Sequence, residues 1–243
     1  MKTSNKILLG LFIAVLLMIT GIHVALTQKY KNGGFVVSKP GQNRDSITIR
    51  PAKFIKVIGL ENVSVIPSES YRLEVAKNMP ASFKHYVSGD TLIITGANGI
   101  SSGKDQINKV KIYQEISLYL PQVTGIEAEN SNLSLVGDGD SARGNQSRVA
   151  LVRSRLSFKN PFTEKETDRY FGDVFVTAKE GSEIELSSDK INFNTLSFEL
   201  EKSILRDLQT GQIRNLVVKA DDSSIVQVSG QNFKKLTAVA TAQ

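Results

Sequence analysis

The chain has 243 residues, of which 40% are hydrophobic, 22% charged and 7% aromatic, a composition typical of a globular protein rather than a disordered or collagen-like one. It contains no cysteine, which excludes disulfides, thiolate metal sites, a cysteine nucleophile and a lipid anchor on cysteine. The formal net charge is +6, but acidic residues are mixed among the cations throughout, so nucleic-acid binding is not expected.

The first expected element is an apolar helix from Ile7 to Leu26, 20 residues without a formal charge. At about 1.5 Å per residue this helix would be about 30 Å long, the thickness of a bilayer core. Ala25 and Thr27 match a signal-peptidase site poorly, which favours an uncleaved anchor over a removed signal. We therefore expect residues 1–27 to be a cytoplasmic tail and a transmembrane anchor. The chain would then be a single-pass inner-membrane protein with its C-terminal domain in the periplasm or outside the cell.

Residues 28–50 carry Gly33-Gly34 and Pro40-Gly41 with no helical apolar period, and we expect them to be a tether. Residues 51–240 form the expected β domain. Short segments alternate apolar and other residues and end at turn formers, as strands do; they include Ile55/Val57, Val63/Val65, Tyr71/Leu73/Val75, Leu92/Ile94 and the run from Val110 to Leu120.

After Pro121 a pattern of apolar, apolar, serine and apolar residues recurs every 20–27 residues. The copies are Ile126-Ala128-Ser131-Leu133, Val149-Leu151-Ser154-Leu156, Val176-Ala178-Ser182-Ile184, Phe198-Leu200-Ser203-Leu205 and Val218-Ala220-Ser223-Ile225. A period of this size suits a parallel β-solenoid, in which each coil buries its apolar row against its neighbours. We interpret the serines as corner residues that bond the local backbone, because no imidazole base and no nucleophile elbow accompany them.

Four stretches resemble the GIN-domain family of auto-transporter adhesin head-like proteins, found mostly in Bacteroidota. They are KFIKVIGLENVSVIPSESYRLEVAKN (53–78), GDTLIITG (89–96), KVKIYQEISLYLPQVTGIEAENSNLSLVG (109–137) and VVKADDSSIVQVSG (217–230). The resemblance implies an all-β, right-handed parallel β-solenoid in an exported or envelope protein without enzymatic activity. The chain departs from the family in its apolar lead and in an insertion-like stretch at 159–172.

Two acidic groups are candidates for chemistry. Asp138 and Asp140 lie on a glycine-rich turn that could offer oxygen ligands to calcium, although the calcium-binding repeat needs many such turns. Asp221-Asp222 could meet Glu180 or Glu201 if their corners stack. Such a cluster would raise the pKa of at least one carboxyl group and would suit a polysaccharide lyase or hydrolase. We favour turn formation as the explanation of both groups.

His23 lies in the apolar lead, which leaves His85 as the one imidazole for a soluble site. Asn62, Asn132 and Asn145 match the glycosylation pattern, which is usually without meaning in bacteria.

We assign no catalytic, cofactor-binding or metal-binding residue and expect no cofactor. The sequence favours a non-enzymatic, membrane-anchored binding or structural domain of the cell envelope, with the membrane and envelope proteins or polysaccharides as partners. The alternative is a carbohydrate-active enzyme or lectin on a parallel β-helix.

Overall fold

A computed structural model describes residues 3–31, 44–77, 79–96, 116–121, 123–140, 146–159, 168–187, 190–208 and 212–240. The chain divides into two compact units, Met1–Asn43 and Arg44–Gln243. The first unit contains a single long helix, α1 (Thr3–Lys31). This helix includes the apolar run from Ile7 to Leu26, so the expected helical conformation of that run is confirmed.

The expectation of a transmembrane anchor in residues 1–27 is wrong. Within the described residues, no helix combines the length and the apolar character needed to cross a membrane. The single-pass inner-membrane location inferred from that anchor is therefore not supported.

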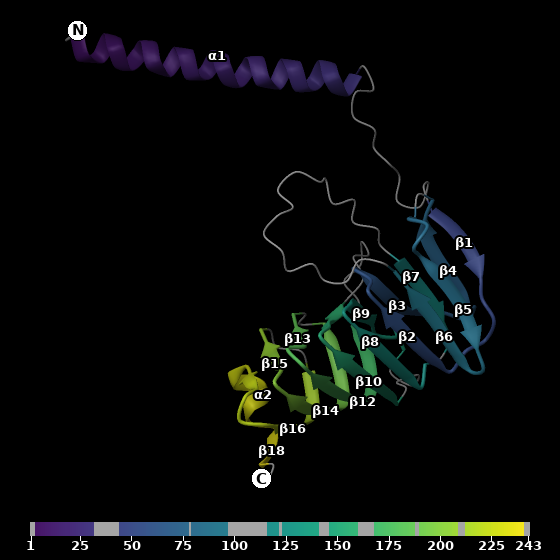
Figure 1. The fold of residues 1–243 in the computed structure, drawn as a ribbon. Helices are drawn as coiled ribbons and strands as arrows, with labels where there is room; N and C mark the ends of the chain where they lie inside the picture. Colours follow the sequence, from purple (N-terminus) through teal and green to yellow (C-terminus); the bar gives the residue numbers. More distant parts are fainter. Residues whose placement is uncertain are drawn as a thin grey trace. The chain divides into compact units, whose positions relative to one another are not determined.

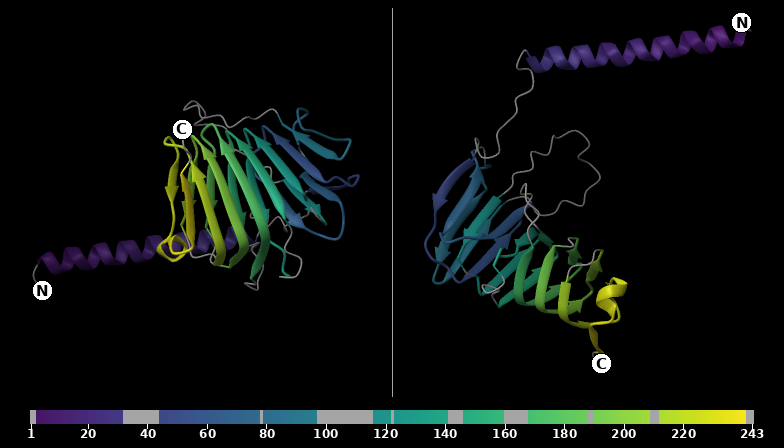
Figure 2. Two further views of the ribbon diagram at one scale, coloured as in Figure 1. Left: turned by 90° about the horizontal axis from the view of Figure 1, so that it is seen from below. Right: turned by 180° about the vertical axis from the view of Figure 1, so that it is seen from behind.

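The second unit is built almost entirely from strands, in two nine-stranded sheets. Sheet A has the order β1-β4-β7-β3-β9-β11-β13-β15-β17, and sheet B has the order β18-β16-β14-β12-β10-β8-β2-β6-β5 (Figures 1 and 2). The strands of sheet A are β1 (Arg44–Thr48), β4 (Arg72–Ala76), β7 (Ile116–Leu120), β3 (Val63–Pro67), β9 (Asn132–Val136), β11 (Arg155–Lys159), β13 (Glu183–Leu186), β15 (Ile204–Asp207) and β17 (Ile225–Gln227). Those of sheet B are β18 (Leu236–Ala240), β16 (Gln212–Ala220), β14 (Ile191–Glu201), β12 (Arg169–Lys179), β10 (Ser147–Val152), β8 (Gly125–Glu129), β2 (Phe54–Ile58), β6 (Thr91–Thr95) and β5 (Lys84–Ser88).

Both sheets are mixed, which contradicts the expected right-handed parallel β-solenoid. In sheet A, β4 is antiparallel to both β1 and β7. In sheet B, β5 is antiparallel to β6. The described strands therefore form two mixed sheets rather than a closed, all-parallel coil. Alternation of apolar residues could not reveal this, because strands of either direction have the same period of two.

The sequence repeats do pair in register within the parallel part of each sheet. In sheet B, the inward row runs through Ile126, Val149, Val176, Phe198 and Val218. In sheet A, the matching row runs through Leu133, Leu156, Ile184, Leu205 and Val226. The last member is Val226 rather than the expected Ile225, because the final corner holds one more residue than the alignment allowed.

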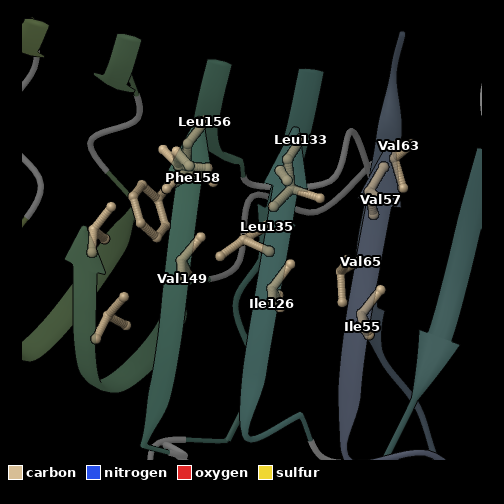
Figure 3. Close-up of a cluster of buried hydrophobic side chains, with 14 of the residues drawn as sticks. Ile55, Val57, Val63, Val65, Ile126, Leu133, Leu135, Val149, Leu156 and Phe158 are labelled. Atoms are coloured by element: carbon tan, nitrogen blue, oxygen red, sulfur yellow. The ribbon is translucent and has the colours of Figure 1, made fainter. Parts of the chain in front are cut away.

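Apolar side chains from both sheets form one continuous core. Figure 3 shows its central part, where Ile55 and Val57 of β2 and Val63 and Val65 of β3 lie together. In the same cluster, the Phe158 ring meets Phe171 and Phe193 edge-on, with centroids 5.2 and 5.1 Å apart. Phe171 and Phe193 stack on each other at 4.8 Å. Aromatic pairs in these geometries add to the stabilisation that burial provides.

Successive corners between the two sheets after Pro121 contain a serine; Ser131, Ser154, Ser182 and Ser203 are buried, and Ser224 is partly buried. The Oγ of Ser154 accepts a hydrogen bond from the Ser131 amide at 3.1 Å and donates one to the Val152 carbonyl at 2.8 Å. The Ser154 amide in turn donates to the Oγ of Ser182 at 3.2 Å. At the last corner, the Oγ of Ser224, and not the expected Ser223, accepts from the Ser203 amide at 3.1 Å. The corner-forming interpretation of the serine row is thus confirmed, with one member shifted.

The residues just before these serines adopt left-handed backbone conformations, with φ of 49° at Asn130, 49° at Arg153 and 50° at Lys202. This region is unfavourable for most side chains. At Arg153, side-chain contacts also join neighbouring corners. The Arg153 guanidinium donates to Asn130 Oδ1 at 2.9 Å and to Glu129 Oε1 at 3.0 Å, and it pairs with Glu180.

A buried carboxylate, that of Asp207, anchors the C-terminal end of the core. Asp207 Oδ2 accepts hydrogen bonds from the Ser229 amide, the Ser229 hydroxyl and Asn232 Nδ2 at 3.1, 2.7 and 2.9 Å. These bonds fix the short helix α2 (Gly230–Phe233), which contacts β16.

Candidate functional site

Three neighbouring strands of sheet B bend at the same register. The inward-facing residues Phe171 and Val174 of β12 are three positions apart, whereas inward positions on a regular strand are two apart. The same spacing occurs at Phe193 and Leu196 of β14 and at Ile213 and Leu216 of β16, which pair with them. An extra residue in a strand bends it and redirects its side chains. Each bend therefore turns two consecutive residues away from the core: Gly172-Asp173, Asn194-Thr195 and Arg214-Asn215.

The bends form the floor of a hollow of about 850 Å³. Its walls are mainly polar and include Tyr170, Asn192 and Lys235. Across its floor, Asn194 Nδ2 donates to Asp173 Oδ1 at 2.7 Å, and Arg214 Nη1 donates to Asn194 Oδ1 at 3.4 Å. These amide, guanidinium and carboxylate groups keep further donor and acceptor capacity for a ligand.

A second hollow, of about 720 Å³, lies over the outward face of β2, β8, β10 and β12. Its centre is one cross-strand row made of Phe54, Gly125, Arg148 and Phe175. Phe54 and Phe175 are each 45% exposed although they are large apolar residues. Gly125 has no side chain to fill the row, and a Cβ there would lie 2.9 Å from Cδ1 of Phe54. The ring of Phe54 therefore leans over Gly125, and it lines the hollow together with Arg148 and Phe175.

The two hollows share Gln146, which borders both of them. We call the combined depression the sheet B groove. It extends from Phe54 on β2, past Arg148 and Phe175, to Arg214 on β16 and Lys235 beyond it. The groove joins exposed aromatic rings at one end to amide and charged side chains at the other. Such a mixture of apolar surface and a few placed polar groups is typical of a binding site.

The proposed calcium turn is stabilised by its own backbone. Asp138 pairs with Tyr170 in an antiparallel bridge, through bonds of 3.0 and 2.8 Å. Asp138 Oδ1 accepts from the Asp140 amide at 3.0 Å, which is the geometry of an Asx turn. No group of three or more potential acidic, histidine or cysteine ligands occurs among the residues that the structure describes.

The proposed acidic cluster does not form at the last corner. Asp221 accepts hydrogen bonds from the Lys202 amide at 3.1 Å and from Ser224 Oγ at 2.6 Å. The bond from Ser224 lowers the pKa of Asp221 below its usual 3.8, opposite to the rise expected for clustered carboxylates. Glu201 instead pairs with Lys179 at 3.1 Å, and this hydrogen bond raises the pKa of Lys179 above 10.5. Asp221 and Glu201 thus each serve a corner contact.

The other candidates lie outside the groove. His85 is half-buried on β5, where its ring lies 5.9 Å from that of Phe83. Asn62 occupies the turn between β2 and β3, with φ of 61°, and Asn132 begins β9. Asn145, and Val110 in the expected strand before Pro121, fall outside the described residues.

The aromatic residues of the groove were not predicted from the sequence. Phe54 and Phe175 both occupy positions that the strand alternation assigns to solvent, next to the inward residues Ile55 and Val176. A large apolar residue on the polar side of an alternating strand is the signal that could have identified them.

No protein-family model matches the chain. A comparison with curated proteins also found no match. Solved structures to which the chain is similar include a "putative adhesin" from Parabacteroides distasonis ATCC 8503, with 14% identity over 76% of this chain and 80% of that chain and a TM-score of 0.45. They also include a "putative lipid binding protein" from the same strain, with 13% identity, 82% and 98% coverage and a TM-score of 0.39. A third is a "putative adhesin" from Bacteroides fragilis NCTC 9343, with 11% identity, 81% and 94% coverage and a TM-score of 0.36.

Proposed function

We propose that the protein is a non-catalytic binding domain whose sheet B groove holds a polysaccharide. The observation that carries this proposal is the pair of exposed rings, Phe54 and Phe175, which lie on one cross-strand row and line the same hollow. This function also fits the GIN-domain resemblance of the sequence, which we retain as a hypothesis of family.

The chemistry of a sugar polymer matches both ends of the groove. The face of an aromatic ring is electron-rich and attracts the slightly positive C–H groups on one side of a pyranose ring. Phe54 and Phe175 lie three strands apart, or about 14 Å at the usual strand spacing. Asn192, Asn194 and Gln146 add amide groups that can both donate to and accept from sugar hydroxyls.

The state of the carboxylates supports a non-catalytic role. A glycosidase or lyase needs acidic groups that converge on one bond of the substrate with separated pKa values. Here Asp221, Glu180 and Glu201 are engaged at corners by a backbone amide or by cations. In the groove, Glu127 is paired with Lys56 at 3.0 Å, and Asp173 is bonded by Asn194.

The proposal is tested by titrating the full chain with a panel of soluble neutral and charged polysaccharides in a calorimeter. At least one polymer should bind saturably, and Phe175→Ala should weaken that binding up to about tenfold, since a well-placed ring contact contributes about 0.5–1.5 kcal/mol. Phe233→Ala is the matched control, because Phe233 is 64% exposed but does not line the groove.

Two results would overturn the proposal. The first is the absence of saturable binding to any polymer, or equal binding by the wild-type protein, Phe54→Ala and Phe175→Ala. The second is the release of reducing ends or unsaturated products from a bound polymer, which would show catalysis.

A further inference from the structure

We propose that the sheet B groove selects an acidic polysaccharide, one that carries carboxylate or sulfate groups at intervals along its chain. This inference rests on the proposed function and adds the charge of the ligand. Four cations, Lys56, Arg148, Arg214 and Lys235, and two anions, Glu127 and Asp173, line the groove among the described residues. Four minus two leaves a surplus of two positive charges.

The cations of the groove differ in how they are engaged. Lys56 forms an ion pair with Glu127, with 3.0 Å between Nζ and Oε2. Arg214 donates only to the neutral amide of Asn194, at the long distance of 3.4 Å. Within the described part of the chain, the side chains of Arg148 and Lys235 have no hydrogen-bonding or ion-pairing partner.

Two other cations on the outward face of sheet B are paired. Lys219 lies 3.0 Å from Glu199, and Lys179 lies 3.1 Å from Glu201. Both pairs join side chains on neighbouring strands, where opposite charges in one row stabilise a sheet. Arg148 in the groove has Gly125 and Phe175 as its row neighbours and therefore lacks such a carboxylate. An anionic ligand can supply the missing partner.

The separation of these cations favours a polymer over a single small anion. Arg148 on β10 and Arg214 on β16 are three strands apart, about 14 Å, and their registers differ by three residues, about 10 Å along the strands. One phosphate or one sugar acid cannot contact both guanidinium groups. A chain with repeated acidic groups can, and arginine offers it paired N–H donors that match carboxylate and sulfate oxygens.

The test compares polygalacturonate with its fully methyl-esterified form, which has the same backbone without the charge. We expect the full chain to bind the acid at least tenfold more tightly than the ester and to lose this preference as salt is raised, because screening weakens exposed ion pairs. The Arg148→Gln/Arg214→Gln double variant should bind the acid no more tightly than it binds the ester. The control, Lys84→Gln/Lys159→Gln, removes the same charge from exposed positions outside the groove and should retain the preference.

The outcomes separate the two proposals. Equal, salt-independent binding of acid and ester that is weakened by Phe175→Ala would overturn the selection of acidic ligands while leaving polysaccharide binding intact. Binding of neither polymer would overturn the inference outright. Acid binding that survives in the arginine double variant would place the interaction outside the groove. Equally tight binding of single-stranded DNA would show a general polyanion surface rather than a glycan site. The salt series on the wild-type protein supplies a result even if the double variant fails to fold.

Discussion

The corner serines should differ in their contribution to stability according to the hydrogen bonds that each hydroxyl makes. Ser154 Oγ both accepts from the buried Ser131 amide and donates to the Val152 carbonyl. Ser203 Oγ donates to the Glu201 carbonyl at 2.9 Å, and no described amide donates to it. Both serines are at most 3% exposed, so water cannot replace the lost partners in either variant.

Replacement of Ser154 by alanine removes two bonds and leaves the Ser131 amide buried without an acceptor. A net hydrogen bond contributes about 1 kcal/mol, and an unsatisfied buried donor costs about 1–3 kcal/mol. We therefore expect Ser154→Ala to lower the free energy of unfolding by about 2–3 kcal/mol and Ser203→Ala by about 1 kcal/mol.

Urea denaturation followed by far-ultraviolet circular dichroism measures this difference, provided that the slope of the free energy against urea is the same in both variants. Equal losses, or a larger loss in Ser203→Ala, would refute the assignment of the extra cost to the orphaned Ser131 amide.

Two further predictions concern the core and the last corner. Leu200→Asp should prevent folding, because Leu200 is 3% exposed and loses about 1.5–3 kcal/mol of burial while gaining an unpaired buried charge; Ser197→Asp, on the outward side of the same strand, should still give a folded protein by circular dichroism. Asp221→Asn should destabilise the protein most above the ordinary pKa of 3.8 and progressively less as the pH falls below it, because the lowered pKa of Asp221 means that folding stabilises its ionised form. Urea unfolding at neutral and acid pH tests this, and a difference between variant and wild type that grows below pH 3.8 would contradict it.

The repeats after Pro121 could be predicted because equivalent positions of successive copies pair across neighbouring strands. A residue of one copy lies beside the equivalent residue of the next, as Val149 lies between Ile126 and Val176. The same stacking places equivalent serines one above the other, so their corner role followed from spacing and turn chemistry. The spacing of the repeats misplaced the serine and the apolar residue of the last copy by one position, because the last corner is one residue longer. A corner can lengthen in this way without disturbing the strands on either side of it.

The remaining architecture could not be predicted from the sequence. Residues 44–96 and 116–120 have the same alternation as the repeats, yet they include the antiparallel strands β1, β4 and β5. Strand direction depends on distant partners and not on local pattern. The groove could not be predicted either, because Phe54, Arg148 and Phe175 come from three separate strands. They share one row only through the register of the sheet.

The bends in β12, β14 and β16 change how densely a sheet can present side chains. A regular strand shows one outward side chain every two residues, about 6.6 Å apart. At each bend two consecutive residues, such as Asn194 and Thr195, face away from the core, only about 3.3 Å apart along the strand. Three aligned bends therefore display six neighbouring positions on a small area while Phe193 and Leu196 keep the core sealed beneath them. Substitutions at those six positions can change the chemistry of the exposed surface without altering the packing below.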